Sequence, residues 1–289
     1  RIAMATLSRP DGATIYYEVH GSGFPLLLIA PGGVSSQVEF WARSPFNPIA
    51  EFADEFQVIA MDQRHAGRSP APAAGFSYAD AAADQLAVLD AAGVTRAHVM
   101  GGCIGCAYIW NLVGAAPDRI VAAVSQNPVG LDETNAIGTF YAMFSETMRV
   151  ARAGGMDAVV KAAVENGLFV AANAGGPFSQ RIHDDEAFRA EILERTVESY
   201  VAQIVRFRDG MWPADGGPFF TISEEGMRTF PVPQLVLPGS DPFHPTGIAH
   251  RICREAPAAR CLDVDWGKPE KVQETVAAVR AFLKEHTPK

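Results

Sequence analysis

The feature that most constrains this 289-residue chain is a glycine-rich turn between a short apolar strand and an apolar helix. Residues 98–101 have the character of a strand, which runs directly into Gly-Gly-Cys-Ile-Gly at residues 101–105. The apolar stretch that follows, to about Ala115, predicts a helix packed centrally on a sheet. In so tight a turn the residues two before and two after the central one must be small, and both are glycine here. The central residue, Cys103, is thereby exposed above the sheet.

Other apolar runs of strand length lie on both sides of this turn, with helical segments between the later ones: residues 15–19, 26–30, 58–61 and 120–124. Strands that alternate with helices predict an α/β protein with parallel strands and helices on both faces of the sheet. The first two runs are separated by a short turn, which instead predicts an antiparallel entry into the sheet.

The pattern changes after Gly130. Residues 131–229 are mostly helical in character, and strand patterns return at 234–237 and 261–264. We therefore expect a core domain of residues 1–130 and 230–289, with residues 131–229 inserted as a helical cap subdomain. Most aromatic residues of the cap serve packing, and a minority, Trp212 among the candidates, would line an apolar pocket suited to a small or medium apolar substrate.

Composition argues against several classes of partner. The net charge is −9, and no run of Lys or Arg exceeds two residues, which argues against nucleic acid and anionic membranes. No apolar stretch approaches the length of a membrane-spanning helix. The N-terminus lacks a signal pattern, and four cysteines are too few for a disulfide framework, so we expect a protein of the reducing cytoplasm. The oligomeric state is open, with a homodimer as one option.

Three further motifs accompany the turn at Cys103. Residues 27–33 read Leu-Leu-Ile-Ala-Pro-Gly-Gly, residues 61–69 read Met-Asp-Gln-Arg-His-Ala-Gly-Arg-Ser, and residues 235–241 read Leu-Val-Leu-Pro-Gly-Ser-Asp. In this order the four motifs resemble those of the α/β-hydrolase-fold superfamily, over almost the full length of the chain. The resemblance implies a mostly parallel central sheet flanked by helices, a helical cap, and no cofactor. It also implies a nucleophile elbow with cysteine where serine is usual.

The resemblance implies a role for several residues. Cys103 would be the nucleophile, and the start of the helix beneath it favours a thiolate. The backbone N–H groups of Ile104 and Gly33 would form the oxyanion hole, with Val34 as the next candidate. Asp241 would be the catalytic acid. The alternative for Asp241 is a turn residue before proline.

The base is missing from its usual place, because the loop at residues 263–269 contains no histidine. His244, three residues after Asp241, and His65 could substitute. The strand before His244 lies about two strand spacings, roughly 10 Å, from that of Cys103, so His244 reaches the thiol only if its loop folds inward. Otherwise His244 starts a helix, and His65 satisfies the backbone of a turn.

Trp266 and Lys268 occupy the region where the base normally acts. Lys268 could pair with Asp241 in a structural role or hold a substrate carboxylate, and the sequence leaves both open. Cys106 forms a C-x-x-C pair with Cys103, which leaves a redox role open, although an elbow of this kind is not the usual setting of a redox pair. No second cluster of cysteine and histidine has the spacing of metal ligands, so no metal is expected.

Three functions fit these features. The leading one is a Cys103-dependent hydrolase or acyl-transfer enzyme acting on an ester, thioester, lactone or similar carbonyl of a small molecule. A cofactor-free lyase or isomerase would use the same oxyanion hole with Asp241. A non-catalytic ligand-binding protein derived from a hydrolase would account for the missing histidine. Deacylation is the step that the sequence supports least, because water needs a base.

Overall fold

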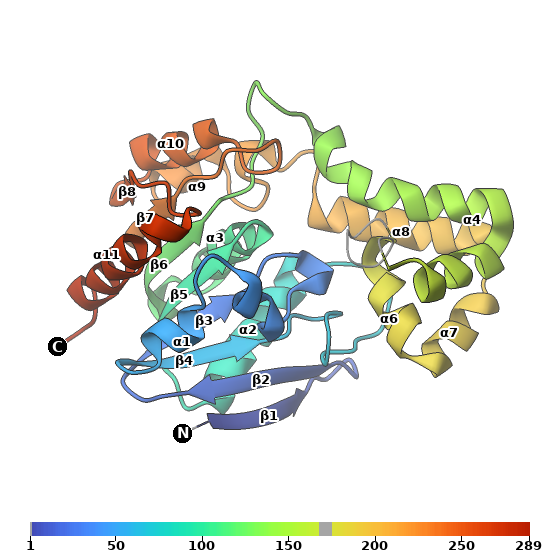
Figure 1. The fold of residues 1–289 in the computed structure, drawn as a ribbon, viewed down its shortest axis with the longest axis horizontal. Coiled ribbons are helices and arrows are strands. Elements are labelled where there is room, and N and C mark those ends of the chain that lie inside the picture. Colours follow the sequence, from blue (N-terminus) through green and yellow to red (C-terminus); the bar gives the residue numbers. More distant parts are fainter. Residues whose placement is uncertain (1, 168–174) are drawn as a thin grey trace. The chain divides into compact units, whose positions relative to one another are not determined.

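The structure, a computed structural model, describes residues 2–167 and 175–289 and divides the chain into two compact units (Figure 1). The first unit contains residues 1–71, 78–135 and 215–289, and the second contains residues 72–77 and 136–214. The second unit is shorter than the expected cap, because residues 131–135 and 215–229 cluster with the first unit. Residues 168–174 of the expected cap lie outside the described residues.

The first unit is organised by an eight-stranded sheet with the strand order β1-β2-β4-β3-β5-β6-β7-β8. The strands are β1 (Ile2–Ser8), β2 (Thr14–His20), β3 (Phe24–Ile29), β4 (Phe56–Met61), β5 (Ala97–Gly102), β6 (Ile120–Gln126), β7 (Gln234–Leu237) and β8 (Ala259–Cys261). Strand β2 pairs antiparallel with β1 and β4, and the pairs from β4 to β8 are parallel. The mostly parallel sheet is confirmed. The chain does enter it antiparallel, but β2 pairs with β1 and β4 and not with β3, the strand that follows it along the chain.

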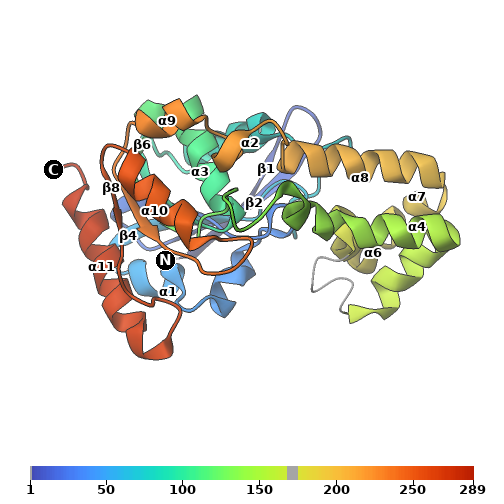
Figure 2. The ribbon, with the colours of Figure 1, turned by 90° about the horizontal axis from the view of Figure 1, so that it is seen from above.

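Helices cover both faces of this sheet. Figure 2 shows α1 and α11 on one side of it and α2 and α3 on the other. The helical segments of the unit are η1 (Gly33–Ser35), η2 (Val38–Arg43), α1 (Pro48–Phe52), α2 (Tyr78–Ala91), α3 (Ile104–Ala115), η3 (Pro117–Arg119), η5 (Gly217–Phe219), α9 (Glu224–Arg228), α10 (Thr246–Glu255), η6 (Pro269–Lys271) and α11 (Val272–Glu285).

The strands are apolar throughout because both of their faces are buried. On β3, Leu26 and Leu28 belong to the core cluster that α11 covers. Leu27 and Ile29 are equally inaccessible to solvent and point to the opposite face. There α3 packs so tightly that a Cβ on Gly105 would lie 2.6 Å from the carbonyl oxygen of Ile29.

The second unit is helical in its described residues. It contains α4 (Ile137–Glu165), η4 (Gly176–Phe178), α6 (Ser179–Asp184), α7 (Glu186–Leu193) and α8 (Val197–Met211). Helix α4 is interrupted at Gly155, whose φ is +74°. Trp212 follows α8, is buried, and stacks on Phe140 with ring centroids 4.4 Å apart. Among the helices described in either unit, none is both long and apolar enough to cross a bilayer.

Two of the four cysteines, Cys253 on α10 and Cys261 on β8, form a disulfide that the low cysteine count did not predict. The disulfide ties the helix that follows the Asp241 loop to the edge of the sheet. Cys103 and Cys106 are free thiols. The expectation of a cytoplasmic protein rested in part on the absence of disulfides, so the location stays a prediction.

His98 is buried near the start of β5, with its ring against Phe24 at a centroid distance of 4.9 Å. Its Nε2 lies 2.9 Å from the hydroxyl oxygen of Thr287, which itself donates to the carbonyl of Leu283, so Nε2–H is the donor. Nδ1 is buried and has no hydrogen-bond partner among the described residues. Burial, with a smaller contribution from His286, lowers the pKa of His98 to about 4.

We expect His98 to make the protein less stable as the pH falls from 6.5 towards 4. In this range the unfolded chain binds a proton at His98 that the folded chain does not, so protonation favours unfolding. At pH 5 the loss relative to neutral pH is about 2 kcal/mol. The free energy of unfolding in urea, measured for the wild type and His98→Gln at pH 7 and pH 5, gives this loss for each protein. Equal losses in the two proteins between these pH values would contradict the assignment.

Candidate active site

Cys103 lies at the apex of the turn between β5 and α3, in a strained conformation with φ +57° and ψ −123°. Its backbone N–H donates to the carbonyl of Gln126, the last residue of β6, at 3.0 Å. A Cβ on Gly101 would lie 2.9 Å from the carbonyl oxygen of Gly105. The flanking residues must therefore be glycine, and the turn leaves the Cys103 side chain partly exposed at the carboxyl edge of the sheet.

Cys106, one helical turn further on, is buried in the core. Its Sγ lies 3.3 Å from the carbonyl oxygen of Gln126 and 3.6 Å from that of Gly101. Burial raises the pKa of the Cys106 thiol well above its usual value, with a smaller effect from Cys103. Cys106 is thus held in its protonated form as a packing residue.

The loop between β7 and α10 folds back on itself. Asp241 and His244 form an isolated bridge, in which the N–H of His244 donates to the carbonyl of Asp241 at 3.0 Å. The carboxylate of Asp241 also accepts hydrogen bonds from the N–H groups of Phe243, at 2.9 Å, and His244, at 3.0 Å. The loop thus folds inward, as the sequence requires if His244 is to reach Cys103.

The side chains of Asp241 and His244 form a directed pair. Nδ1 of His244 lies 2.8 Å from Oδ2 of Asp241, so Nε2 is the ring nitrogen left for Cys103. Nε2 is buried and has no ideal hydrogen-bond partner among the described residues, although the Cys103 side chain interacts with the ring.

Charge stabilises the protonated form of His244. Burial opposes that charge, but the interactions with the Cys103 side chain and with the Asp241 carboxylate outweigh it and raise the pKa of His244 to about 9. Burial alone would raise the pKa of the Asp241 carboxyl. The interactions with His244 and the hydrogen bonds from the turn N–H groups outweigh burial, so this pKa lies below its usual value. An imidazolium at neutral pH therefore lies between Cys103 and a carboxylate.

Three neighbours hold this loop in place. A Cβ on Gly239 would lie 2.5 Å from the Cβ of His244 and 3.2 Å from that of Asn127, so only glycine fits between them. Asn127 follows β6 with φ +36°, a left-handed conformation that asparagine tolerates better than most residues. The indole N–H of Trp266 donates to the carbonyl of Pro238 at 2.7 Å. Trp266 thus supports the loop in the region where the sequence lacks a base.

The remaining candidates lie in several environments. Lys268 is exposed and pairs with Asp265 at 2.9 Å instead of with Asp241, which leaves the substrate-carboxylate alternative as a prediction. His65 has φ +76°, and its N–H donates to the carbonyl of Ser69 at 2.9 Å, so its backbone closes the turn after β4. Trp212 belongs to the second unit, and its place in a pocket stays a prediction.

The loop after β3 lies beside the elbow, since a Cβ on Gly102 would be 3.0 Å from Cγ of Pro31. Gly33 in this loop has φ +58° and is the first residue of η1, and Val34 is the second. Ile104 is the first residue of α3, where a backbone N–H lacks a partner within the helix. No acceptor for the N–H of Gly33 or Ile104 is found in the described part of the chain, and their role in an oxyanion hole stays a prediction.

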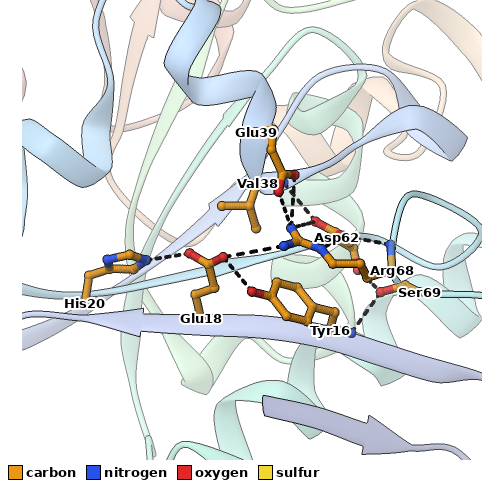
Figure 3. Close-up of polar contacts among 8 residues, drawn as sticks. All are labelled: Tyr16, Glu18, His20, Val38, Glu39, Asp62, Arg68 and Ser69. Atoms are coloured by element: carbon orange, nitrogen blue, oxygen red, sulfur yellow. Dashed lines mark hydrogen bonds and ion pairs between the residues drawn. The ribbon is translucent and has the colours of Figure 1, made fainter. Parts of the chain in front are cut away.

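Asp62 fixes this loop through the turn that follows β4 (Figure 3). Its carboxylate is inaccessible to solvent and accepts from the N–H of Val38 at 2.9 Å and from Nε of Arg68 at 2.9 Å. Arg68 also pairs with Glu39 at 2.7 Å. The turn and the segment after the glycine loop are thereby joined by buried and charge-assisted hydrogen bonds.

Strand β2 extends this network in a way that the sequence motif did not reveal. Tyr16, Glu18 and His20 alternate along one face of the strand (Figure 3). The Glu18 carboxylate accepts from the Tyr16 hydroxyl at 2.7 Å and lies 2.7 Å from Nε2 of His20. The Arg68 guanidinium lies 3.6 Å above the Tyr16 ring, and burial, with the Glu18 contact, raises the pKa of Tyr16 to about 12.

We expect His244 to titrate near pH 9 in the wild type and at lower pH in Cys103→Ser and Asp241→Asn. Each variant removes one of the negative groups that stabilise the imidazolium. Long-range ¹H–¹⁵N NMR of the histidine rings measures the midpoint, with the six other histidines as internal controls. A His244 midpoint near 6.5 in the wild type would contradict the pairing.

Gly239→Ala should displace His244, because the added methyl group needs the space of its Cβ. We expect iodoacetamide to alkylate Cys103 about tenfold more slowly at pH 7 in this variant than in the wild type. This factor corresponds to a loss of about 1.4 kcal/mol of ion pairing. Gly267→Ala is the matched control, since its Cβ would meet nothing within 4 Å. Equal alkylation rates in the two variants would show that the loop tolerates the methyl group without moving the imidazole.

Comparison with known proteins identifies the same architecture. The sequence model of the α/β-hydrolase fold matches residues 25–154. A protein of Azorhizobium caulinodans named "Putative carbamate hydrolase RutD" is 36% identical over 150 residues, which are 52% of this chain and 53% of that protein. Zearalenone hydrolase of Bionectria ochroleuca is 35% identical over 121 residues, 40% of this chain and 44% of the enzyme. The chain thus matches about half of the length of such relatives.

Solved structures match over more of the chain. The enol-lactonase of Burkholderia xenovorans LB400 superposes with a TM-score of 0.64 at 17% identity, covering 97% of this chain and 100% of that one. The esterase RhEst1 of Rhodococcus sp. ECU1013 superposes with a TM-score of 0.63 at 20% identity, covering 98% and 99%. With its mostly parallel eight-stranded sheet flanked by helices, the chain has the α/β-hydrolase fold.

Proposed function

We propose that the protein is a hydrolase that uses Cys103 as its nucleophile on the carbonyl group of a small to medium apolar molecule. The observation that carries this proposal is the contact of Cys103 with a histidine whose other ring nitrogen is bonded to Asp241. A nucleophile, a base and an acid that orients the base are the components of a catalytic triad. The histidine comes from the loop after β7 instead of the loop after β8.

Acylation begins with the Cys103 thiolate. Its sulfur attacks the carbonyl carbon, and the carbonyl π electrons move onto the oxygen, which accepts hydrogen bonds from the N–H groups of Gly33 and Ile104. When the carbonyl re-forms, the bond to the leaving group breaks. The imidazolium of His244 gives its proton to that group, which leaves in its neutral form. The products of this half are an acyl-thioester on Cys103 and a neutral imidazole.

Deacylation uses the neutral imidazole as the base. The acylated sulfur carries no charge, so one cause of the raised pKa of His244 has disappeared. His244 takes a proton from water while the oxygen of that water attacks the thioester carbon. Collapse of the second oxyanion breaks the carbon–sulfur bond, releases the acid, and restores the thiolate beside the imidazolium. An alcohol, thiol or amine in place of water would make the same cycle an acyl transfer.

The named relatives favour carbonyl substrates with a leaving group. The names of two relatives refer to carbamate and to zearalenone, and two structural neighbours are an enol-lactonase and an esterase. Together with the nucleophile, they support an ester, thioester, lactone or carbamate of a small molecule as the substrate class. The assembled histidine weakens the main argument for a non-catalytic protein, and the lyase or isomerase alternative would use the same N–H groups and Asp241.

We expect turnover of p-nitrophenyl acetate and of an acyl thioester to fall below detection in Cys103→Ala and by about 10²–10⁴-fold in His244→Ala. Release of product and the intact mass of the protein are followed together. Cys106→Ala is the matched control, because it removes the second thiol of the same turn and leaves the proposed mechanism intact.

The intact mass of the protein distinguishes a defect in acylation from a defect in deacylation. His244→Ala should accumulate an acyl adduct on Cys103, since deacylation depends on the base more than the attack of a thiolate does. The proposal fails if Cys103→Ala retains the turnover of the wild type, or if the wild type acquires no acyl group from any activated ester or thioester.

A further inference from the structure

The end of β6 lies between the two strands that carry the candidate active site. Register pairs join the last residues of β5, β6 and β7, and the residues that follow these strands are Cys103, Asn127 and Pro238. On one side of β6 the N–H of Cys103 donates to the carbonyl of Gln126, and on the other side the N–H of Asn127 donates to that of Leu237. Asn127 is therefore the residue between the nucleophile elbow and the loop after β7.

An imidazole that reaches from the loop after β7 to Cys103 has to cross the end of β6. Neighbouring strands are about 4.8 Å apart, so Asn127 lies near the middle of this crossing. The contacts at Gly239 agree with this placement. A Cβ there would lie 2.5 Å from the Cβ of His244 and 3.2 Å from that of Asn127, so the last two atoms lie within about 6 Å of each other.

The side chain of Asn127 extends from this contact towards the nucleophile elbow. A Cβ on Gly102, the residue directly before Cys103, would lie 3.7 Å from Oδ1 of Asn127. One end of the side chain is thus near the Cβ of His244, and the other end is near the backbone of the elbow. A group attached at position 127 therefore acts on both members of the Cys103–His244 pair.

The residue type at this position is restricted by the backbone and by charge. Asn127 has φ +36°, in the left-handed region that glycine, asparagine and aspartate enter most readily. Glycine would leave the space beside His244 empty. Aspartate would add a carboxylate to the two titratable groups that already act on the ring, Cys103 and Asp241. Of the three residue types, only asparagine fills the space without a charge.

We propose that Asn127 is a positioning residue, which supports the imidazole of His244 between Asp241 and Cys103 and whose lack of charge lets that imidazole act as a base. The second half of this inference rests on the proposed function, because a base is needed only for deacylation. The first half does not, since the ring needs its support whether or not an acyl group is formed. Asparagine and aspartate have nearly the same shape, so substitution between them separates support from charge.

Two substitutions at this position should move the titration of His244 in opposite directions. Asn127→Gly keeps the left-handed backbone and removes the support, so the midpoint should fall from near 9 towards 6.5 as the ring loses Cys103. Asn127→Asp keeps the support and adds a negative charge, so the midpoint should rise by about one pH unit or more. Long-range ¹H–¹⁵N NMR of the histidine rings measures both midpoints.

Asn47→Asp is the matched control for the added charge. Asn47 is the N-cap of α1, and a carboxylate there keeps the hydrogen bond from the N–H of Ile49, so its His244 midpoint should equal that of the wild type. A midpoint in Asn127→Asp that equals the wild-type value would overturn the inference. A fall of the midpoint in both Asn127 variants would also overturn it, by showing that the position only maintains the loop. Asn127→Asp decides alone if the glycine variant does not fold.

The two steps of the reaction with p-nitrophenyl acetate test the role of charge. Asn127→Asp should acylate Cys103 within about threefold of the wild-type rate, because the thiolate needs no base. It should deacylate up to about tenfold more slowly at pH 7 and recover as the pH rises, since its imidazole stays protonated to a higher pH. Stopped-flow absorbance and intact mass follow the two steps.

The outcomes separate this inference from the proposed function. Deacylation with an unchanged pH profile, in a variant whose His244 midpoint has risen, would overturn the role of the missing charge. A wild-type protein that is never acylated would refute the proposed function, and the midpoints of the Asn127 variants would still decide whether this residue supports the ring.

Discussion

The carboxylate of Asp241 is the interaction on which the rest of the site depends. One of its oxygens accepts two backbone N–H groups from its own turn, and the other faces the Nδ1 of His244 at 2.8 Å. The same group therefore shapes the loop and orients the imidazole of His244 that the loop carries. Because a hydrogen bond to a carboxylate is stronger than a neutral one, a short loop suffices to hold an imidazole against Cys103. The raised pKa of His244 is the electrostatic consequence of this arrangement.

The elements that follow from local chemistry could be predicted from the sequence. The elbow was recognisable because a Cβ at position 101 or 105 would clash with the backbone. Any chain that forms this turn therefore needs glycine at both positions. The parallel arrangement of most strands followed from apolar runs separated by helical segments, whereas their order in the sheet was not predicted. The position of Asp241 after β7 followed from the resemblance. Each of these signals lies within one short segment of the chain.

The rest depends on contacts between segments that no single pattern reports. The sequence placed His244 two strands from Cys103, and only the fit of His244 against Gly239 and Asn127 shows that the loop turns inward. The bounds of the second unit differ from those of the expected cap because residues 215–229 pack with the sheet unit despite their mostly helical character. The disulfide joins Cys253 on α10 to Cys261 on β8, and no local motif reports that this helix and this strand pack against each other.

The proposed base, His244, and the proposed acid, Asp241, share one turn, so the neighbouring segments only have to hold that turn in place. In this chain the loop after β8 supplies no base, and Trp266 instead donates a hydrogen bond to Pro238 at the start of the Asp241 loop. The other end of that loop enters α10, which the Cys253–Cys261 disulfide joins to β8. The loop is thus fixed at both ends by parts of one sheet edge. Its geometry therefore depends on β7, β8 and α10 together, so a substitution in the β8 loop can alter the base although no residue of that loop reaches Cys103.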